Sequence, residues 1–199
     1  MLRVAITGGI ACGKSTVGSF LRAKGIPVCE ADELAHAVMR KGAGVYLKVM
    51  ETFGRNIAGP DGEIDRATLG GIVFGAPGKL ADLNSIVHPV VKRRWRAWLS
   101  GLGGNLRMAA VIVPLLYEIG DAGSWDRVIC VGASEQYQRE RLRERGLCDS
   151  GIGRRLASQM PVAEKMERAD FVIENCGTIR LAKRQTARIL KQLLESENA

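Results

Sequence analysis

The feature that most constrains the fold of this chain is a segment near its N-terminus, Gly8 to Ser15, which reads GGIACGKS. It matches the pattern G-x-x-x-x-G-K-[ST] at every position. An apolar stretch, VAIT, precedes it, and a stretch with helical character follows. A glycine-rich turn with an incidental lysine would not need that strand–loop–helix context, whereas a phosphate loop does. The segment therefore predicts a phosphate-binding loop.

The chemistry of such a loop requires these residue types. Glycines let the backbone wrap closely, so that successive N–H groups can point at phosphate oxygens. The N-terminus of the following helix adds the positive end of its dipole. Lys14 supplies a mobile positive charge to the phosphates, and the hydroxyl of Ser15 can bind Mg²⁺. The sequence therefore predicts a nucleoside triphosphate site.

Apolar, β-branched stretches alternate along the chain with stretches of helical character. The apolar stretches lack strict alternation of polar and apolar residues, which is typical of strands buried on both faces of a parallel sheet. We expect strands at 4–7, 26–29, 108–116, 128–131 and 171–173, and helices at 14–24, 32–40, 79–100, 134–145 and after 178. This order predicts an α/β fold with a parallel sheet of about five strands flanked by helices.

Two segments interrupt that alternation. The segment 42–78 contains nine glycines and little strand pattern, and it predicts short helices and turns over the sheet. The segment 139–168 is rich in arginine and poor in core residues, and we call it the lid. Within the long helical stretch, Pro89 has no N–H to donate, so we expect it to begin a helical segment rather than interrupt one.

Charge and cysteine content exclude several classes of protein. The 199 residues include 29 lysines and arginines against 21 acids, and this surplus favours phosphate-bearing partners. Five cysteines without a CxxC pair, and only two histidines, argue against a disulfide framework or a structural zinc site. No apolar run approaches the roughly 20 residues of a membrane span, and we find no signal peptide. We expect a cytoplasmic protein.

Several classes of nucleotide-binding protein remain to be compared. A GTPase would need D-x-x-G and N-K-x-D elements, and neither occurs. An RNA-binding regulatory NTPase would use the basic clusters at 92–96 and 139–155, but aromatic residues total only 5%. A small-molecule kinase needs a compact core, an acceptor pocket and an arginine-bearing lid, and the chain has candidates for all three. The chain is therefore best interpreted as a kinase, with its acceptor left open.

An ordered set of further motifs narrows the acceptor. These are TGGI at 7–10, AD at 31–32, LNSIVHP at 83–89, VPLLYE at 113–118, QxxRxxxR at 138–145, RxxxQMP at 155–161, EK at 164–165, AD at 169–170 and NxG at 175–177. On these motifs, which extend over essentially the whole chain, it resembles the dephospho-coenzyme A kinases. The resemblance implies ATP-dependent phosphorylation of the ribose 3′-hydroxyl of dephospho-CoA to give coenzyme A, the last step of its biosynthesis.

The resemblance also implies an organisation and a set of partners. It implies one P-loop kinase domain over 1–199, with a core of about 1–32, 105–138 and 169–199, a small helical acceptor-binding insertion of about 33–104, and the lid. ATP and dephospho-CoA are the expected partners, with Mg²⁺ as cofactor. We expect no nucleic acid, no membrane, and a monomer or weak homo-oligomer.

The site residues follow from the same resemblance and from the loop chemistry. The expected catalytic residues are Asp32, Lys14 and Arg141. The expected ATP-binding residues are Gly9, Ile10, Ala11, Cys12, Gly13, Lys14, Ser15, Thr16, Arg145, Asn175 and Gly177. The expected substrate-binding residues are Thr7, Asp32, His88, Leu115, Glu118 and Arg155, and Ser15 is the expected metal ligand.

Some of these residues have competing interpretations. Asp32 is expected to accept the proton of the attacking hydroxyl; alternatively it binds Mg²⁺ through water, or caps a helix at 33–40. Glu118 either orients Mg²⁺ through water or caps a helix. The family usually carries Asp at the position of Glu30, and the longer side chain changes its reach.

The arginines and His88 also have structural alternatives. Arg141 and Arg145 lie four residues apart and so share one helical face, which suits recognition of phosphate. The alternative is a surface helix in which Glu140 and Glu144 neutralise them. His88 either contacts the acceptor or is structural.

Cys12 lies inside the phosphate loop, two residues before Lys14. One hypothesis is a reactive thiol, because a nearby lysine and a helix N-terminus stabilise the thiolate. The favoured alternative is that cysteine is simply small enough to fit there.

Overall fold

The computed structural model describes residues 1–195 and divides the chain into two compact units. The first consists of Met1–Glu30 and Leu102–Ala199, and the second is Ala31–Gly101. The phosphate loop and the lid both belong to the first unit. Within residues 1–195, no helix is both long and apolar enough to cross a membrane.

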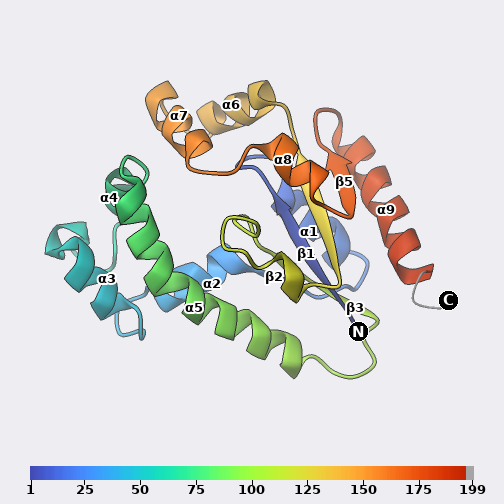
Figure 1. Cartoon of the computed structure of the whole chain (residues 1–199), viewed down its shortest axis with the longest axis horizontal. Coiled ribbons are helices and arrows are strands. Elements are labelled where there is room, and N and C mark those ends of the chain that lie inside the picture. Colours follow the sequence, from blue (N-terminus) through green and yellow to red (C-terminus); the bar gives the residue numbers. More distant parts are fainter. Residues whose placement is uncertain (196–199) are drawn as a thin grey trace. The chain divides into compact units, whose positions relative to one another are not determined.

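The first unit is built on a sheet of five parallel strands (Figure 1). The strands are β1 (Leu2–Gly8), β2 (Val28–Glu30), β3 (Met108–Ile112), β4 (Arg127–Gly132) and β5 (Phe171–Glu174), in the order β2-β3-β1-β4-β5. Strand β1 is central, and its residues 4–6 are fully buried. The predicted parallel sheet of about five strands is confirmed.

The third strand is shorter than the apolar run 108–116 predicts. Strand β3 ends at Ile112, and the chain turns away through Pro114, which has no N–H to donate to a ladder. Val113 is still buried and donates its N–H to Ile6 O at 2.9 Å. Apolar character continues past the strand because burial continues, so composition alone overestimates the strand.

Helices cover the sheet of the first unit. They are α1 (Lys14–Arg22), α6 (Glu135–Glu144), α7 (Asp149–Ala157), α8 (Val162–Glu167) and α9 (Ile179–Glu195), with a 3₁₀ turn η2 (Ala122–Ser124). Helices α1 and α9 bury Leu21, Ile189 and Leu193 against the strands in the main core. Helix α8 packs against β1 and β4. The lid helices share a smaller cluster in which Leu142 and Ile152 pack with Ala11 of the phosphate loop.

The second unit is helical, as the glycine-rich segment predicts. It contains α2 (Ala31–Val38), α3 (Tyr46–Phe53), η1 (Arg55–Ile57), α4 (Arg66–Val73) and α5 (Pro77–Gly101). Helices α2, α3 and α4 each pack against α5, which has 25 residues. The expectation that Pro89 begins a helical segment is wrong, because Pro89 lies inside α5. The helix continues through it at the cost of one backbone hydrogen bond.

Candidate active site

The phosphate loop connects β1 to α1, and its outer glycines are required by geometry. Gly8 and Gly13 have φ of 138° and 98°, in the region that L side chains rarely adopt. A Cβ at Gly8 would lie 2.0 Å from Val131 O, and one at Gly13 would lie 2.2 Å from Asn175 Nδ2. The loop can therefore pass between β4 and the end of β5 only with glycine at both positions.

Side chains hold the carbonyl oxygens of the loop. All five oxygens of residues 8–12 accept a hydrogen bond, two from the loop's own lysine and three from side chains of α6 and the end of β5. The bonds are Lys14 Nζ to Gly8 O (3.0 Å) and Gly9 O (2.8 Å), Gln138 Nε2 to Ile10 O (2.8 Å), Arg141 Nη1 to Ala11 O (3.0 Å) and Asn175 Nδ2 to Cys12 O (2.9 Å). The shape of the loop is therefore set by the protein before any ligand binds.

Arg141 and Asn175 act together on the loop. Besides its bond to Ala11 O, the Arg141 guanidinium donates through Nη2 to Asn175 O at 2.8 Å. Ala11 has φ of 57°, an unfavourable conformation for alanine, and its carbonyl is the one that Arg141 holds. The sequence-based alternative for Arg141, neutralisation by Glu140 and Glu144, is not what the structure has.

The neighbouring arginines of α6 form the surface ion pairs expected of solvated residues. Arg139 pairs with Glu135 at 2.6 Å, and Arg143 pairs with Asp149 at 2.8 Å. Arg145 follows the last residue of α6 and is exposed, so only Arg141 of the predicted pair reaches the loop.

At the other end of the loop, Ser15 meets a carboxylate. Its Oγ donates to Glu30 Oε2 at 3.2 Å, and Arg22 Nη2 donates to Glu30 Oε1 at 2.9 Å. Glu30 is the last residue of β2, so the longer glutamate side chain reaches the loop directly. Hydroxyl and carboxylate oxygens are the ligand types that Mg²⁺ prefers, and this pair fits such an ion. No group of three or more acidic, histidine or cysteine ligands occurs among residues 1–195.

An ion pair made by a buried lysine ties the end of the lid to the segment that follows β3. Lys165 in α8 is fully buried, and its Nζ lies 2.7 Å from Glu118 Oε1 and 2.8 Å from Pro114 O. Glu118 Oε1 also accepts the N–H of Met160 at 3.0 Å. Thr7, at the end of β1, donates to the same Pro114 O. Glu118 thus pairs with a lysine and a lid amide, instead of capping a helix.

Asp32 and the two histidines belong to the second unit. Asp32 is exposed in the first turn of α2, two residues after Glu30, and is a helical residue rather than the N-cap of a helix at 33–40. Burial lowers the pKa of His88, and the negative charge of Asp32 partly opposes this. Burial also lowers the pKa of His36, with Arg66 adding to that effect and Asp32 opposing it. Asp32 therefore has two largely neutral imidazoles within electrostatic range.

The remaining predicted residues are less closely grouped. Leu115 and Arg155 are half-buried, the latter in α7, whereas Gly177 is exposed after β5. Cys12 lies on the loop, and Thr16 lies in α1. Sequence reasoning named Gln138, Gln159 and Lys165 only as parts of motifs, and their place in motifs within or next to the lid was the available signal for their roles.

The reactive-thiol hypothesis for Cys12 is wrong. Its side chain is fully buried, and burial raises the pKa of the thiol more than Lys14 lowers it. A buried thiol with a raised pKa is a poor nucleophile. The favoured alternative, a small residue that fits the loop, agrees with its place in the core cluster.

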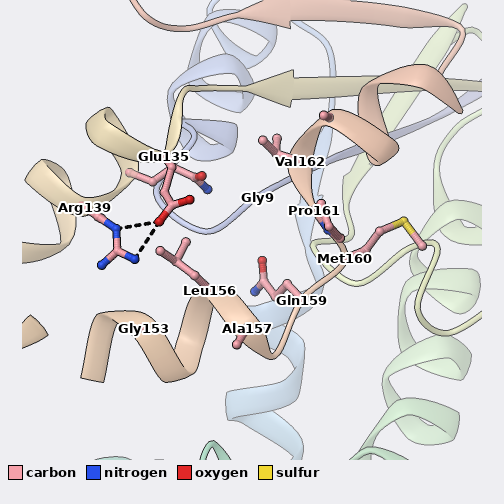
Figure 2. Close-up of a pocket in the computed structure, with 12 residues that line it drawn as sticks. Gly9, Glu135, Arg139, Gly153, Leu156, Ala157, Gln159, Met160, Pro161 and Val162 are labelled. Carbon is pink, nitrogen blue, oxygen red and sulfur yellow. Dashed lines mark hydrogen bonds and ion pairs between the residues drawn. The ribbon is translucent and has the colours of Figure 1, made fainter. Parts of the chain in front are cut away.

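The lid and the loop border a cavity of about 570 Å³ (Figure 2). Gly9 contributes from the loop, Leu156 from α7, and Gln159 and Pro161 from the segment before α8. The Glu135–Arg139 ion pair lies in its wall (Figure 2). The wall is thus apolar apart from this pair and the two glutamines, Gln138 and Gln159.

The chain matches the family described as dephospho-CoA kinase over residues 2–180. It belongs to the dephospho-CoA kinase family. A dephospho-CoA kinase of Geobacillus kaustophilus is 43% identical over 193 residues, covering 96% of each chain. One of Anaeromyxobacter dehalogenans is 42% identical, covering 96% of this chain and 91% of the relative. Dephospho-CoA kinases phosphorylate dephospho-CoA to CoA in the final step of CoA biosynthesis, so this family member is a kinase.

Solved structures agree with the P-loop kinase fold of this dephospho-CoA kinase family member. TT1252 from Thermus thermophilus matches with a TM-score of 0.79 and 33% identity, covering 96% of this chain and 97% of the other. A dephospho-CoA kinase from Campylobacter jejuni has a TM-score of 0.69 at 24% identity, covering 98% of both chains. Shikimate kinase from Acinetobacter baumannii shares the fold alone, with a TM-score of 0.54 at 14% identity, covering 98% and 94%.

Proposed function

We propose that this chain transfers the γ-phosphoryl group of ATP to the ribose 3′-hydroxyl of dephospho-CoA. The observation that carries the donor half of this proposal is the phosphate loop. The carbonyl oxygens of its residues 8–12 are each bonded to a side chain. Family membership supports the acceptor half. The two together favour this reaction over phosphorylation of another nucleoside.

On the donor side, the loop and the start of α1 bind the phosphates of ATP. The loop's N–H groups and the positive end of the α1 dipole attract the anion. Lys14, which bridges Gly8 O and Gly9 O, needs only a side-chain rotation to place its ammonium on the transferring phosphate. Arg141 adds positive charge behind Ala11, where it stabilises charge that develops during transfer.

On the acceptor side, Asp32 accepts the proton of the 3′-hydroxyl as its oxygen attacks phosphorus. Its exposed carboxylate keeps room for a substrate, and Asp32 comes two residues after the carboxyl end of β2 in the sequence. Ligands of parallel α/β folds bind beyond the carboxyl ends of the strands. His88, whose lowered pKa keeps it neutral near pH 7, is suited to donate or accept a hydrogen bond without adding charge.

We also propose that the reaction uses Mg²⁺, with Ser15 as a ligand and Glu30 holding its hydroxyl in place. The ion neutralises charge on the β- and γ-phosphates when it is bound. Arg22 keeps the Glu30 carboxylate on the Ser15 side by a hydrogen bond of 2.9 Å. The carboxylate then supplies a second oxygen ligand, directly or through a water molecule.

The proposal is tested by measuring ADP release from MgATP with four acceptors: dephospho-CoA, adenosine, AMP and shikimate. Shikimate is included because shikimate kinase shares the fold. We expect turnover with dephospho-CoA alone, and a product that carries its new phosphate at the 3′ position by ³¹P NMR. Turnover confined to another acceptor would overturn the acceptor assignment and leave the phosphate loop in place.

Other expectations remain proposals. All five cysteines are free, which supports a reducing compartment such as the cytoplasm. A monomer or weak homo-oligomer without nucleic acid is tested by light scattering and by the absorbance ratio of the purified protein.

A further inference from the structure

Two glutamines, one just before the lid and one inside it, bond to the same residue of the phosphate loop. Gln138, in α6 just before the lid, donates through Nε2 to Ile10 O at 2.8 Å. Gln159, between α7 and α8, accepts the N–H of Ile10 through Oε1 at 3.0 Å. The two peptide groups that flank Ile10 are therefore each held by one glutamine.

The surroundings of both glutamines favour these bonds. Gln138 is only 4% exposed, and a hydrogen bond shielded from water is stronger and more costly to break. Gly9 leaves the space that Gln138 uses, since a Cβ there would lie 2.4 Å from Gln138 Nε2. Leu142 and Ile152 of the lid pack with Ala11, so an apolar contact lies beside the two polar ones.

The ion pair between Lys165 and Glu118 holds the residue that follows Gln159. Glu118 accepts the N–H of Met160, the residue after Gln159, and Glu118 is itself held by the fully buried Lys165. Gln159 is therefore placed by its neighbour's backbone and not by its own rotamer alone.

We propose that Gln138 and Gln159 are positioning residues for phosphoryl transfer, holding the first half of the phosphate loop from α6 and from the segment between α7 and α8. The proposal rests on the proposed function, because it requires that the loop bind ATP. Both glutamines act through the backbone of Ile10. Neither is assigned a contact with substrate.

The two halves of the loop differ in what holds them. The second half opens α1, where Val17 N donates to Gly13 O at 3.1 Å without help from the lid. Loss of a glutamine should leave that half, and with it most of the ATP affinity, in place. The first half would gain freedom, and small misplacements at a reacting centre reduce rate more than binding.

The first experiment replaces each glutamine with methionine, which has a similar shape and no amide. We expect kcat to fall about tenfold or more in Gln138→Met and Gln159→Met, while the Kd for ATP changes by less than about threefold. Gln136→Met is the matched control, because Gln136 lies on the same helix, is exposed, and bonds to Glu140. It should match the parent in kcat, Kd and Tm.

A second pair of variants separates bonding from charge. Gln159→Glu keeps an acceptor for Ile10 N–H, whereas Gln138→Glu turns an acceptor towards Ile10 O, and both add one negative charge beside the loop. We expect kcat of Gln138→Glu to lie at least about tenfold below that of Gln159→Glu. If Gln138→Met does not fold, the proposal is tested with Gln159→Met and Gln159→Glu, since Gln159 is only half-buried.

Unchanged kcat in both methionine variants, or equal kcat in both glutamate variants, would overturn the proposal. A lower Tm with normal kcat for the folded protein would assign the glutamines a purely structural role and would also overturn it. A parent enzyme inactive on dephospho-CoA would instead refute the proposed function, so the two failures are distinguishable.

Discussion

The phosphate loop is held at five consecutive carbonyl oxygens, whereas Asp32 lies exposed in the first turn of α2. Gln138, Arg141 and Asn175 hold three of these oxygens independently of Lys14, so the loop backbone needs little reorganisation when Lys14 turns towards a phosphate. The second leaves its carboxylate open, within electrostatic range of His88 and His36. With the roles proposed above, the donor site is preorganised and the acceptor side is completed by its substrate.

The largest effect should come from removing the loop's own charge. In Lys14→Ala we expect kcat/KM to fall about 1,000-fold, because one preorganised donor at a developing charge contributes on this scale. The measurement is ADP release with dephospho-CoA, with circular dichroism and Tm as controls for folding. Near-normal activity in a folded Lys14→Ala protein would refute the phosphate-loop assignment.

Removal of the proposed base tests the acceptor region directly. In Asp32→Asn we expect kcat to fall about 100-fold with little change in KM for ATP, since general base catalysis contributes on this order. Tm should not decrease, because Asp32 is exposed. Steady-state kinetics in both substrates is the check. A rise in KM for ATP without loss of kcat would contradict the role of Asp32 as proton acceptor and favour its binding Mg²⁺ through water.

Arg141 both holds the loop backbone and adds positive charge beside it. In Arg141→Ala we expect kcat to fall about tenfold or more, and by a larger factor than KM for dephospho-CoA rises. Arg141→Lys keeps the charge and loses the two-oxygen hydrogen bonding to Ala11 O and Asn175 O. A pure KM effect would make Arg141 a ground-state binder.

The acceptor region should also be the more sensitive to acid. Burial lowers the pKa of His88 below its usual 6.5, so the unfolded chain takes up a proton at higher pH than the folded chain. Neutral His88 therefore makes its full contribution to the free energy of unfolding above its usual pKa of 6.5. That contribution is lost as the pH falls through the lower pKa of the folded state. We expect Tm to drop by a few degrees between pH 7.5 and 5.5, and to drop less in His88→Gln. Equal slopes for the two proteins would exclude His88 as the cause.

The smallest effect is expected at Cys12, inside the loop. Iodoacetamide should modify exposed Cys148 first, because hydrogen bonds to its sulfur lower the pKa of that thiol, while buried Cys12 stays unmodified. Peptide mass spectrometry measures the order of labelling. The parent and Cys12→Ser should lose activity equally under the reagent. Protection of the parent by MgATP that is absent in Cys12→Ser would contradict this.

Local patterns were enough to predict the sheet and the phosphate loop. A strand, a glycine-rich loop and a helix in that order depend on contacts between near neighbours, and Gly8 and Gly13 are required by the backbone of the loop. The end of β3 and the path of the helix through Pro89 were predicted wrongly. Strand β3 ends early because the chain turns at Pro114 although burial continues. Helix α5 continues through Pro89, with buried Val87 and Val91 on either side of it.

The sequence by itself predicted the phosphate loop and, through its motifs, determined which family the chain belongs to. Only the tertiary structure decided what holds the loop in shape. The bond from Gln138 to Ile10 spans 128 residues, and that from Asn175 to Cys12 spans 163. No pattern along the chain reports a hydrogen bond between positions so far apart. The donor and acceptor of each bond meet only because the parallel sheet brings the ends of β1, β4 and β5 to one edge.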